Sequence, residues 1–370
     1  MIYLDHGATS FPKPESVRRA VAEAMEVCAN PGRGSHPAAR VAAERVFRCR
    51  EAVGELFHCK PEQAVFTMNC TQGLNMAIRT LVRPGDRVVI SGFEHNAVTR
   101  PLHGLGARIA VAGKKLFDRE DTLRQFHREL SRGAGAAVFT HVSNVFGYIL
   151  PVEEMAGMCR KKGIPFIIDA AQSAGAVEID VQKLGADFIA MPGHKGLLGP
   201  MGTGVLICRR LPAPLVMGGT GSESARQKMP DILPDRGEAG TANVPGIAGL
   251  EAGIRVVLER GAQRIGTEER RLARRAAQML EKAGMEVFCG EDLLGTLSFR
   301  CGMDCEEAGE ILAENGIAVR AGLHCAPLAH RSAGTADTGT VRLSFGFDST
   351  ERDVDELKRA VQTSLLPRRP

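Results

Sequence analysis

Seven short β-rich runs alternate with helical patterns through the first two thirds of the chain, and this alternation limits the fold more than any other feature. Nearly continuous apolar strands separated by amphipathic helices, such as residues 151–162, indicate a mainly parallel sheet covered on both faces. We therefore predict a large α/β domain with a seven-stranded sheet. Its strands are expected at residues 64–67, 87–91, 108–112, 136–142, 165–169, 187–191 and 204–208.

The pattern changes near residue 252 into that of a smaller α+β domain. The expected elements are a short N-terminal strand at 2–4, a long charged helix at about 253–283, strands near 295–300, 317–320 and 341–344, and helices at 305–315 and 349–365. We predict that residues 14–252 form the large domain. Residues 1–13 and 253–370 then form the small domain.

Composition narrows the classes of function. The 370 residues include 47 Lys and Arg against 43 Asp and Glu, interspersed and without a basic block, so no nucleic-acid partner is expected. No segment resembles an export signal or a membrane span, and the ten cysteines are scattered without a C-x-x-C pair. A cytoplasmic protein with reduced thiols is the expectation. Cys301 and Cys305 have no second pair or histidine nearby, so no metal site is predicted.

Polar residues that follow apolar strands are the first candidates for a site, because ligands of open α/β sheets lie at the carboxyl ends of the strands. Thr71 and Gln72 open a helix after the first of these strands, where free N–H groups and the helix dipole favour a phosphate. A plain N-terminal cap is the alternative. His95 and Asn144 each follow a later strand. Taken singly, such a residue is more often part of an ordinary loop than a ligand.

A strand-end acid and a lysine in a glycine-flanked turn complete the pattern. Asp169 ends the strongly apolar run IPFIID, with Gln172 three residues later, and a buried acid there requires a cationic or hydrogen-bonding partner. His194 and Lys195 lie in the turn GHKG between two strands. Pyridoxal 5'-phosphate requires a lysine that forms a Schiff base, a carboxylate that keeps the pyridine nitrogen protonated, and a phosphate cradle. The sequence therefore predicts this cofactor.

These residues stand within longer motifs that resemble one known family. The motifs extend nearly from end to end: YLDHGATSFPKP, NPGRGSH, EHNAVTRP, HVSNVFG, IDAAQSAGA, GHKGLLGPMGTG, EAGTANVPGIAGL, VRAGLHCAP and TVRLSFGF. The chain resembles the fold-type I pyridoxal-phosphate enzymes of the class V aminotransferase family. Within that family it is similar to the cysteine desulfurases and selenocysteine lyases that have a short catalytic loop. The resemblance implies a homodimer with composite active sites.

The resemblance also implies roles for particular residues. Lys195 corresponds to the Schiff-base lysine, Asp169 to the partner of the pyridinium nitrogen, and His95 to the imidazole stacked on the cofactor ring. With the cysteine described next, Lys195 and His95 are the predicted catalytic residues. The other predicted cofactor contacts are Gln172 with the phenolic oxygen, Thr71, Gln72 and His194 with the phosphate, Asn144, and Thr241 with the phosphate of the neighbouring subunit.

Cys325 decides the predicted reaction. It directly follows His324, and a thiolate nucleophile requires nearby positive charge or imidazole, for which His324 and Arg320 are the candidates. The resemblance implies that Cys325 takes the sulfur of L-cysteine as a persulfide and leaves L-alanine. Arg342, 17 positions later, corresponds to the arginine that holds the substrate carboxylate, with Asn144 and His324 as further substrate contacts. This short spacing is typical of the group that needs a separate sulfur acceptor.

Four residues depart from the pattern of these desulfurases. Pro192 replaces a serine that contacts phosphate, Gln72 replaces an acid, Leu323 a histidine and His6 an asparagine. Because of these four departures, the sequence does not decide between subfamilies or between substrates. A cysteine desulfurase is the leading prediction. The alternatives are a selenocysteine lyase, an aminotransferase or β-eliminating lyase that acts on another amino acid, and a catalytically silent scaffold.

Overall fold

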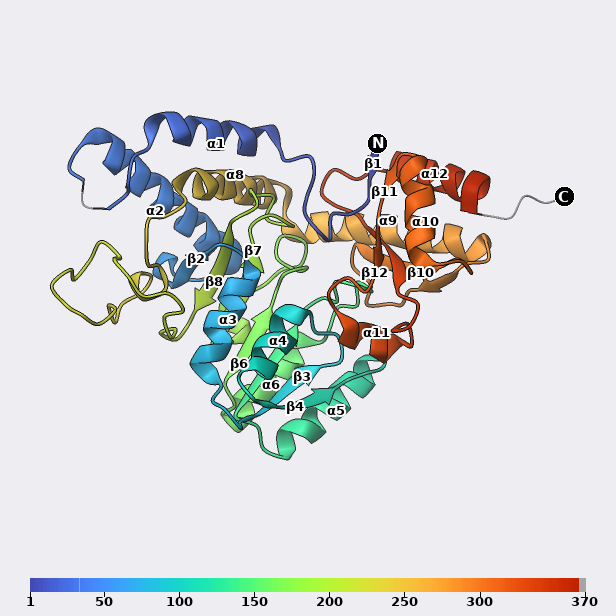
Figure 1. Cartoon of the computed structure of the whole chain (residues 1–370), viewed down its shortest axis with the longest axis horizontal. Helices are drawn as coiled ribbons and strands as arrows, with labels where there is room; N and C mark the ends of the chain where they lie inside the picture. Colours follow the sequence, from blue (N-terminus) through green and yellow to red (C-terminus); the bar gives the residue numbers. More distant parts are fainter. Residues whose placement is uncertain (33, 366–370) are drawn as a thin grey trace.

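A seven-stranded sheet forms the centre of the larger part of the molecule (Figure 1), in a computed structural model that describes residues 1–32 and 34–365. The strand order is β2-β8-β7-β6-β5-β3-β4, and β8 alone runs antiparallel to its neighbours in this sheet. The predicted mainly parallel sheet is confirmed. Its strands are β2 (Ala64–Thr67), β3 (Arg87–Ser91), β4 (Arg108–Ala112), β5 (Ala136–Thr140), β6 (Phe166–Asp169), β7 (Phe188–Pro192) and β8 (Gly204–Cys208).

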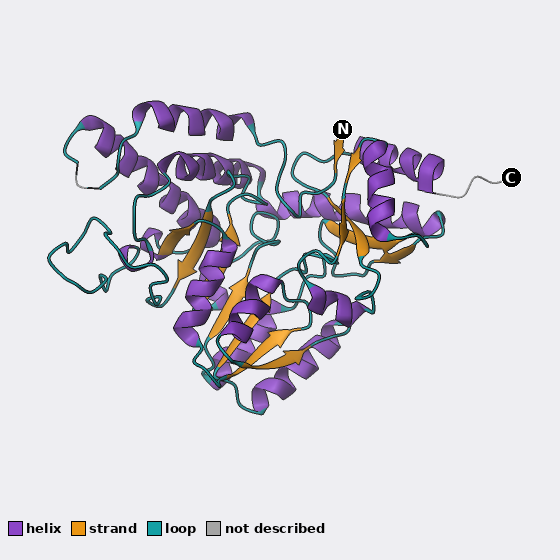
Figure 2. Cartoon of the chain, viewed as in Figure 1, coloured by secondary structure: helices purple, strands orange, loops and turns teal. Residues whose placement is uncertain are grey.

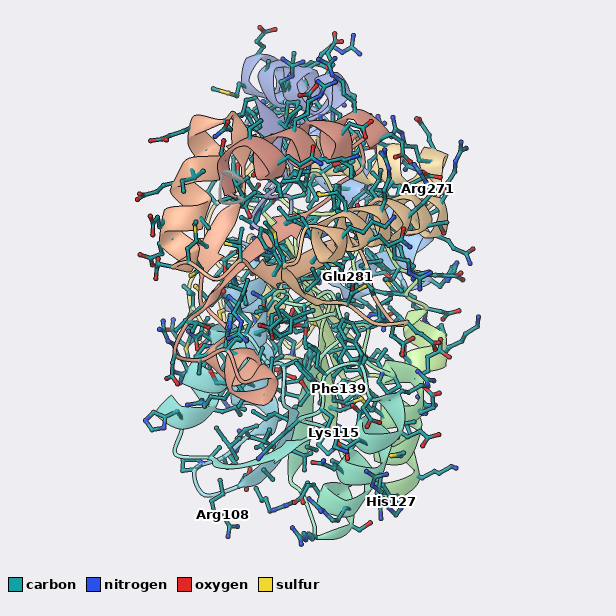
Figure 3. All side chains as sticks on the ribbon, turned by 90° about the vertical axis from the view of Figure 1, so that its right-hand side faces the viewer. Arg108, Lys115, His127, Phe139, Arg271 and Glu281 are labelled. Atoms are coloured by element: carbon teal, nitrogen blue, oxygen red, sulfur yellow. The ribbon has the colours of Figure 1, made fainter. Side chains whose placement is uncertain are left out.

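Helices cover both faces of this sheet, because alternate residues of its central strands point to opposite sides. Phe139 and Ile168 pack with α2, α5, α6 and α8, whereas Val138 and Ile167 pack with α3 and α4. In Figure 3, Phe139 lies inside the layers and Arg108 lies at the outer edge. The helices are α1 (Glu15–Val27), α2 (Pro37–Phe57), α3 (Cys70–Leu81), α4 (Asn96–Gly104), α5 (Arg119–Ser131), α6 (Val152–Lys162), α7 (Val181–Leu184) and α8 (Val244–Arg260).

A smaller α+β unit contains the last third of the chain and the N-terminal strand (Figure 2). It has a four-stranded antiparallel sheet, β12-β13-β10-β9, and a two-stranded parallel sheet, β1-β11. The strands are β1 (Ile2–Tyr3), β9 (Glu286–Phe288), β10 (Thr296–Arg300), β11 (Ile317–Ala318), β12 (Arg320–Gly322) and β13 (Thr340–Ser344). The helices are α9 (Ala262–Lys282), α10 (Cys305–Glu314), α11 (Pro327–Ala333) and α12 (Glu351–Ala360), which continues into a π-helical turn at Val361–Leu365.

Two predicted elements were wrong in extent. The single helix expected at about 253–283 is two helices, α8 and α9, which meet at Gly261 with a left-handed φ of 82°. The single strand expected at 317–320 is divided between two sheets, because β11 pairs with β1 while β12 pairs with β13. α8 packs on α1 and α2. The proposed boundary between residues 252 and 253 therefore lies within α8.

Within the described part of the chain, no helix is both long enough and apolar enough to span a bilayer.

Candidate active site

The turn between β7 and β8 holds Lys195 in the interior. Added Cβ atoms at Gly193 and Gly196 would lie 2.1 Å from the Thr203 hydroxyl oxygen and 2.3 Å from the Ala174 carbonyl oxygen, so only glycine fits at either position. Lys195 is half-buried in this turn and lines a pocket together with Gln172. Burial lowers the pKa of Lys195 to about 8, and the positive charge of Arg342 contributes in the same direction.

Asp169 ends β6, the strand next to β7, and its side chain is buried. One carboxylate oxygen accepts the Ala171 N–H at 2.9 Å and the Cys70 S–H at 3.5 Å. Burial raises the pKa of Asp169, and the Ala171 N–H and the charge of Lys195 oppose that rise. Two donors leave free acceptor positions on a buried carboxylate, so a further donor such as a pyridinium N–H would be stabilised there.

The start of α3 forms an anion-binding end beside the same strands. Asn69 caps the helix by accepting the Gln72 N–H at 2.9 Å, and the Gln72 side chain accepts the Met68 N–H at 2.6 Å. The plain cap considered from the sequence is therefore present, the phosphate cradle at the same helix end stays a prediction, and Thr71 is exposed there. His194 contributes a buried Nδ1 without a partner among the described residues.

His95 and Gln172 are also fixed by nearby backbone. The His95 Nδ1 accepts the Ala97 N–H at 3.0 Å, which leaves the ring proton on Nε2. Burial, followed by the charge of Lys195, lowers the pKa of His95 to about 4, so the imidazole is neutral at pH 7. Gln172 donates to the Gly7 carbonyl at 3.0 Å and lines the same pocket as Lys195.

Arg342 brings a buried cation from the small unit into the site. It lies on β13 with 1% of its surface exposed, and it donates to the Asp5 carboxylate at 2.5 Å and to the Asn144 carbonyl at 3.1 Å. Its Nε is buried without a partner among the described residues. A buried donor without an acceptor is unfavourable, and a substrate carboxylate would satisfy it.

Cys325 lies in the loop after β12 and is exposed. Its carbonyl accepts the Asn96 N–H at 2.8 Å, at the start of the helix that His95 caps. The Asn144 amide donates to the preceding carbonyl, that of His324, at 2.8 Å. Both His324 and Cys325 have left-handed φ angles, 49° and 57°. Two segments of the large unit therefore hold a strained cysteine loop of the small unit.

Arg320 and His324 differ in their relation to the cysteine sulfur. Arg320 directs a guanidinium N–H toward the Cys325 Sγ at 3.9 Å. The His324 ring instead lies against Thr340, with its Nε2 3.1 Å from the carbonyl oxygen and 3.2 Å from the hydroxyl. Burial and the charge of Arg342 lower the pKa of His324 to about 2, so it is uncharged. Of the two candidates, Arg320 supplies positive charge to the sulfur.

Thr241 and Gln72 line a surface groove of about 850 Å³, whereas Lys195 lines a separate pocket. Thr241 is exposed and precedes α8. The structure also locates three of the residues that depart from the family pattern. Pro192 ends β7, Leu323 is 41% exposed, and His6 is buried with its Nε2 3.6 Å from Asp348.

Three contacts of the site were missed from the sequence. Asp5 pairs with Arg342, Cys70 donates to Asp169, and the Asn96 N–H binds the Cys325 carbonyl. The motif YLDHGATSFPKP, which contains Asp5, was a usable signal, since an acid in an otherwise buried arm needs a partner. The partner itself is 337 positions away, which no local pattern could reveal.

The donor and acceptor groups fit pyridoxal 5'-phosphate. Lys195 offers a buried amine of lowered pKa, Asp169 offers free acceptor positions, and the α3 N-terminus with the unpartnered His194 Nδ1 offers donors for a phosphate. A mainly parallel seven-stranded sheet with this lysine and this carboxylate at neighbouring strand ends defines the fold-type I class of pyridoxal-phosphate enzymes.

Comparisons with known proteins agree with that class. The sequence matches the model of the aminotransferase class-V family over residues 2–357. It is 34% identical to a probable cysteine desulfurase of Pyrococcus abyssi, over 96% of this chain and 92% of the relative, and 32% identical to a cysteine desulfurase of Escherichia coli O157:H7, over 98% and 93%. The solved apo structure of the Thermococcus onnurineus NA1 cysteine desulfurase matches with a TM-score of 0.89 and 31% identity, over 98% of this chain and 94% of that one. The chain belongs to the aminotransferase class-V family.

The pKa of Lys195 has a direct consequence for cofactor capture. Only the neutral amine attacks an aldehyde, so the rate at which the cofactor-free protein captures pyridoxal phosphate is expected to rise with pH up to about 8 and then level off. Stopped-flow absorbance at a series of pH values measures this rate. A rate that still rises toward the ordinary lysine value of 10.5 would contradict the buried setting of the amine.

Proposed function

We propose that this protein is a pyridoxal-phosphate-dependent cysteine desulfurase, which converts L-cysteine to L-alanine and holds the sulfur as a persulfide on Cys325. One observation carries the proposal: the Asn96 N–H and the Asn144 amide hold the cysteine loop at the ends of β3 and β5, on the same edge of the sheet as Lys195. An exposed cysteine at that place can meet a substrate from one side and solvent from the other.

The residues that would hold the cofactor come from five strand ends, those of β2, β3, β5, β6 and β7. Lys195 would bond it covalently, Asp169 would accept the ring N–H, and the neutral His95 lies on the same edge of the sheet. Thr71, Gln72 and His194 would contact the phosphate, Gln172 would donate to the ring oxygen, and Asn144 would be a further contact. The bound cofactor supplies an electron sink for bonds at the amino-acid carbon.

Arg342 orients the substrate. Its guanidinium is already fixed by Asp5 and by the Asn144 carbonyl, so little side-chain entropy is lost when a carboxylate binds the remaining Nε edge. The planar fork also sets the direction in which the substrate side chain points. That direction is toward the Cys325 loop, because Asn144 contacts both Arg342 and the His324 carbonyl.

The sulfur transfer uses the Cys325 thiolate as the nucleophile. Its Sγ attacks the substrate sulfur, an S–S bond forms, and the Cβ–S bond of the substrate breaks with its electron pair remaining on carbon. Lys195, whose pKa of about 8 allows both protonation states near neutral pH, moves protons between the substrate carbons. In sum, L-cysteine and the Cys325 thiol become L-alanine and the Cys325 persulfide.

A homodimer is part of the proposal. The groove that contains Thr241 and Gln72 is also lined by Met68 and Val216, two exposed apolar side chains that a second copy of the chain would cover. Thr241 would then contact the phosphate bound to the other subunit. Gel filtration with light scattering measures whether the protein is a dimer in solution.

The persulfide requires a sulfur acceptor, which we propose to be a separate protein or a small thiol. Arg320 and the exposed Leu323 lie beside Cys325, so an acceptor thiol can approach from solvent. All ten cysteines lie among the described residues and are free, which supports a cytoplasmic location.

The proposed function is tested with L-cysteine and a reductant. The purified protein with pyridoxal phosphate is expected to form alanine and sulfide in equal amounts. L-Selenocysteine is assayed in parallel, and an α-keto acid is added in a third arm. Pyruvate in place of alanine, turnover only with the keto acid, or turnover of selenocysteine alone would refute the assignment.

A further inference from the structure

An ion pair between the buried Arg50 and the half-buried Glu238 fixes the segment that precedes Thr241. Glu238 receives both arms of the Arg50 guanidinium, with NH1 2.9 Å from Oε1 and NH2 2.6 Å from Oε2. The Phe66 N–H also donates to Oε1, at 2.6 Å. The carboxylate is therefore held by a fork from α2 and by a backbone group of β2. We call Arg50 and Glu238 the clamp.

The surroundings of the clamp leave little freedom. Arg50 also donates to the Ala64 carbonyl and lies over the Phe66 ring at 4.4 Å, and its side chain is only 8% exposed. A Cβ at Gly237 would lie 2.5 Å from a methyl group of Val65, so the segment is pressed onto β2 just before the clamp. Bidentate, desolvated pairs hold a definite geometry, and removing one partner leaves an uncompensated charge.

These contacts to Glu238 are more numerous than is needed to hold an exposed surface loop. Beyond it the chain passes Gly240, whose N–H donates to Gly219, and reaches the exposed Thr241. In Figure 1 this loop extends from the sheet beside α2, on the side away from the small unit. Thr241 lines the surface groove and not the pocket of Lys195. The fixed segment is therefore presented outward, where a second copy would meet it.

We propose that Arg50 and Glu238 are positioning residues that act on the other subunit: they hold Thr241 at the phosphate of the cofactor bound to the partner. The proposal rests on the dimeric enzyme described above. It differs from a purely local role, in which the clamp would support only the cofactor site of its own chain through β2 and α3.

Replacing Arg50 with alanine is expected to weaken cofactor binding by about ten- to a hundredfold, as expected for a misplaced hydrogen bond to a charged group. Glu238→Gln keeps the size of the side chain and provides a second variant if Arg50→Ala folds poorly. Arg48→Ala is the matched control, because Arg48 lies on the same helix and pairs with Glu251. Cofactor affinity is measured by equilibrium dialysis and absorbance, and folding by thermal melting.

Mixed dimers, purified with two different affinity tags, separate the two roles. In the first dimer, one subunit carries Arg50→Ala and the other carries Lys195→Ala. Its one intact lysine faces the intact clamp of the other subunit, so cofactor is expected to bind with wild-type affinity at half the wild-type stoichiometry. In the second dimer, a subunit with both changes is paired with a wild-type subunit. Its one lysine faces a broken clamp, and weak binding is expected.

The opposite pattern, weak binding in the first dimer and tight binding in the second, would show a local role and overturn the proposal. Equal affinity in both dimers would overturn it as well. These measurements follow cofactor and not cysteine turnover, so a wrong substrate would leave them unchanged. A wild-type dimer that binds no pyridoxal phosphate would refute the proposed function and the clamp together.

Discussion

Replacing Lys195 with alanine is expected to abolish covalent attachment of the cofactor and to reduce alanine formation by at least about a thousandfold, since a positioned proton-transfer group alone contributes about 10²–10⁴. Lys195 is half-buried close to Asp169, and no other lysine is described in that pocket. The variant is expected to show no absorbance band from lysine-bound cofactor. Alanine is quantified by chromatography after incubation with L-cysteine.

The direction of the pKa shift predicts that unfolding does not cause that loss. The folded pKa of Lys195, about 8, is below the unfolded value of 10.5, so burying the charged amine opposes folding below pH 8, and this cost disappears as the pH rises toward 10.5. At pH 7 the alanine variant should therefore melt no lower than the wild type. Lys183→Ala is a control, because this lysine is exposed and pairs with Asp180. Normal turnover by Lys195→Ala would refute its role.

Replacing Cys325 with alanine is expected to reduce sulfide and alanine formation from L-cysteine by about a hundredfold or more, while leaving cofactor binding intact. The cysteine is exposed on a loop, its carbonyl accepts the Asn96 N–H, and its Sγ has an Arg320 N–H at 3.9 Å. A side-chain truncation keeps that backbone contact. The loss of turnover should thus be confined to the chemical step. The mass spectrum of the variant after incubation with L-cysteine should also lack the added sulfur atom that the wild type shows.

Cys28→Ala provides the matched control for this experiment. Cys28 is half-buried after α1, far along the chain from the site residues, and its removal should change neither turnover nor the persulfide mass. Unchanged sulfide formation by Cys325→Ala would refute the persulfide mechanism. Loss of cofactor from Cys325→Ala would instead indicate that the loop supports the cofactor site through Asn96 and Asn144.

The sheet could be predicted closely because its signals are local. Each strand of the large unit is a short apolar run bounded by polar or glycine residues, and β2, β3, β4 and β8 have the expected bounds. Lys195 and Asp169 were predicted as site residues for the same reason, since Asp169 ends one such run and Lys195 lies in the turn after the next. Parallel strands then bring their carboxyl ends together without further information.

The parts that the sequence did not predict depend on distant partners. The 317–320 segment is divided because β1, from the other end of the chain, pairs with Ile317 and Ala318. His324 was a candidate for the sulfur, but Thr340 from β13 holds its ring. The helix break at Gly261 was missed because a single glycine within a helical pattern is compatible with a continuous helix.

The contact between Asp5 and Arg342 also constrains biosynthesis. The two residues are 337 positions apart, and Gly7 and Ser344 are joined by a hydrogen bond over the same separation. At about 5–20 residues per second, a ribosome exposes the first partner roughly 20 to 70 seconds before the second. The segment around Asp5 and Gly7 therefore lacks its native partners until Arg342 and Ser344 have been synthesised, and we expect chaperone binding to the nascent chain to concentrate on that segment.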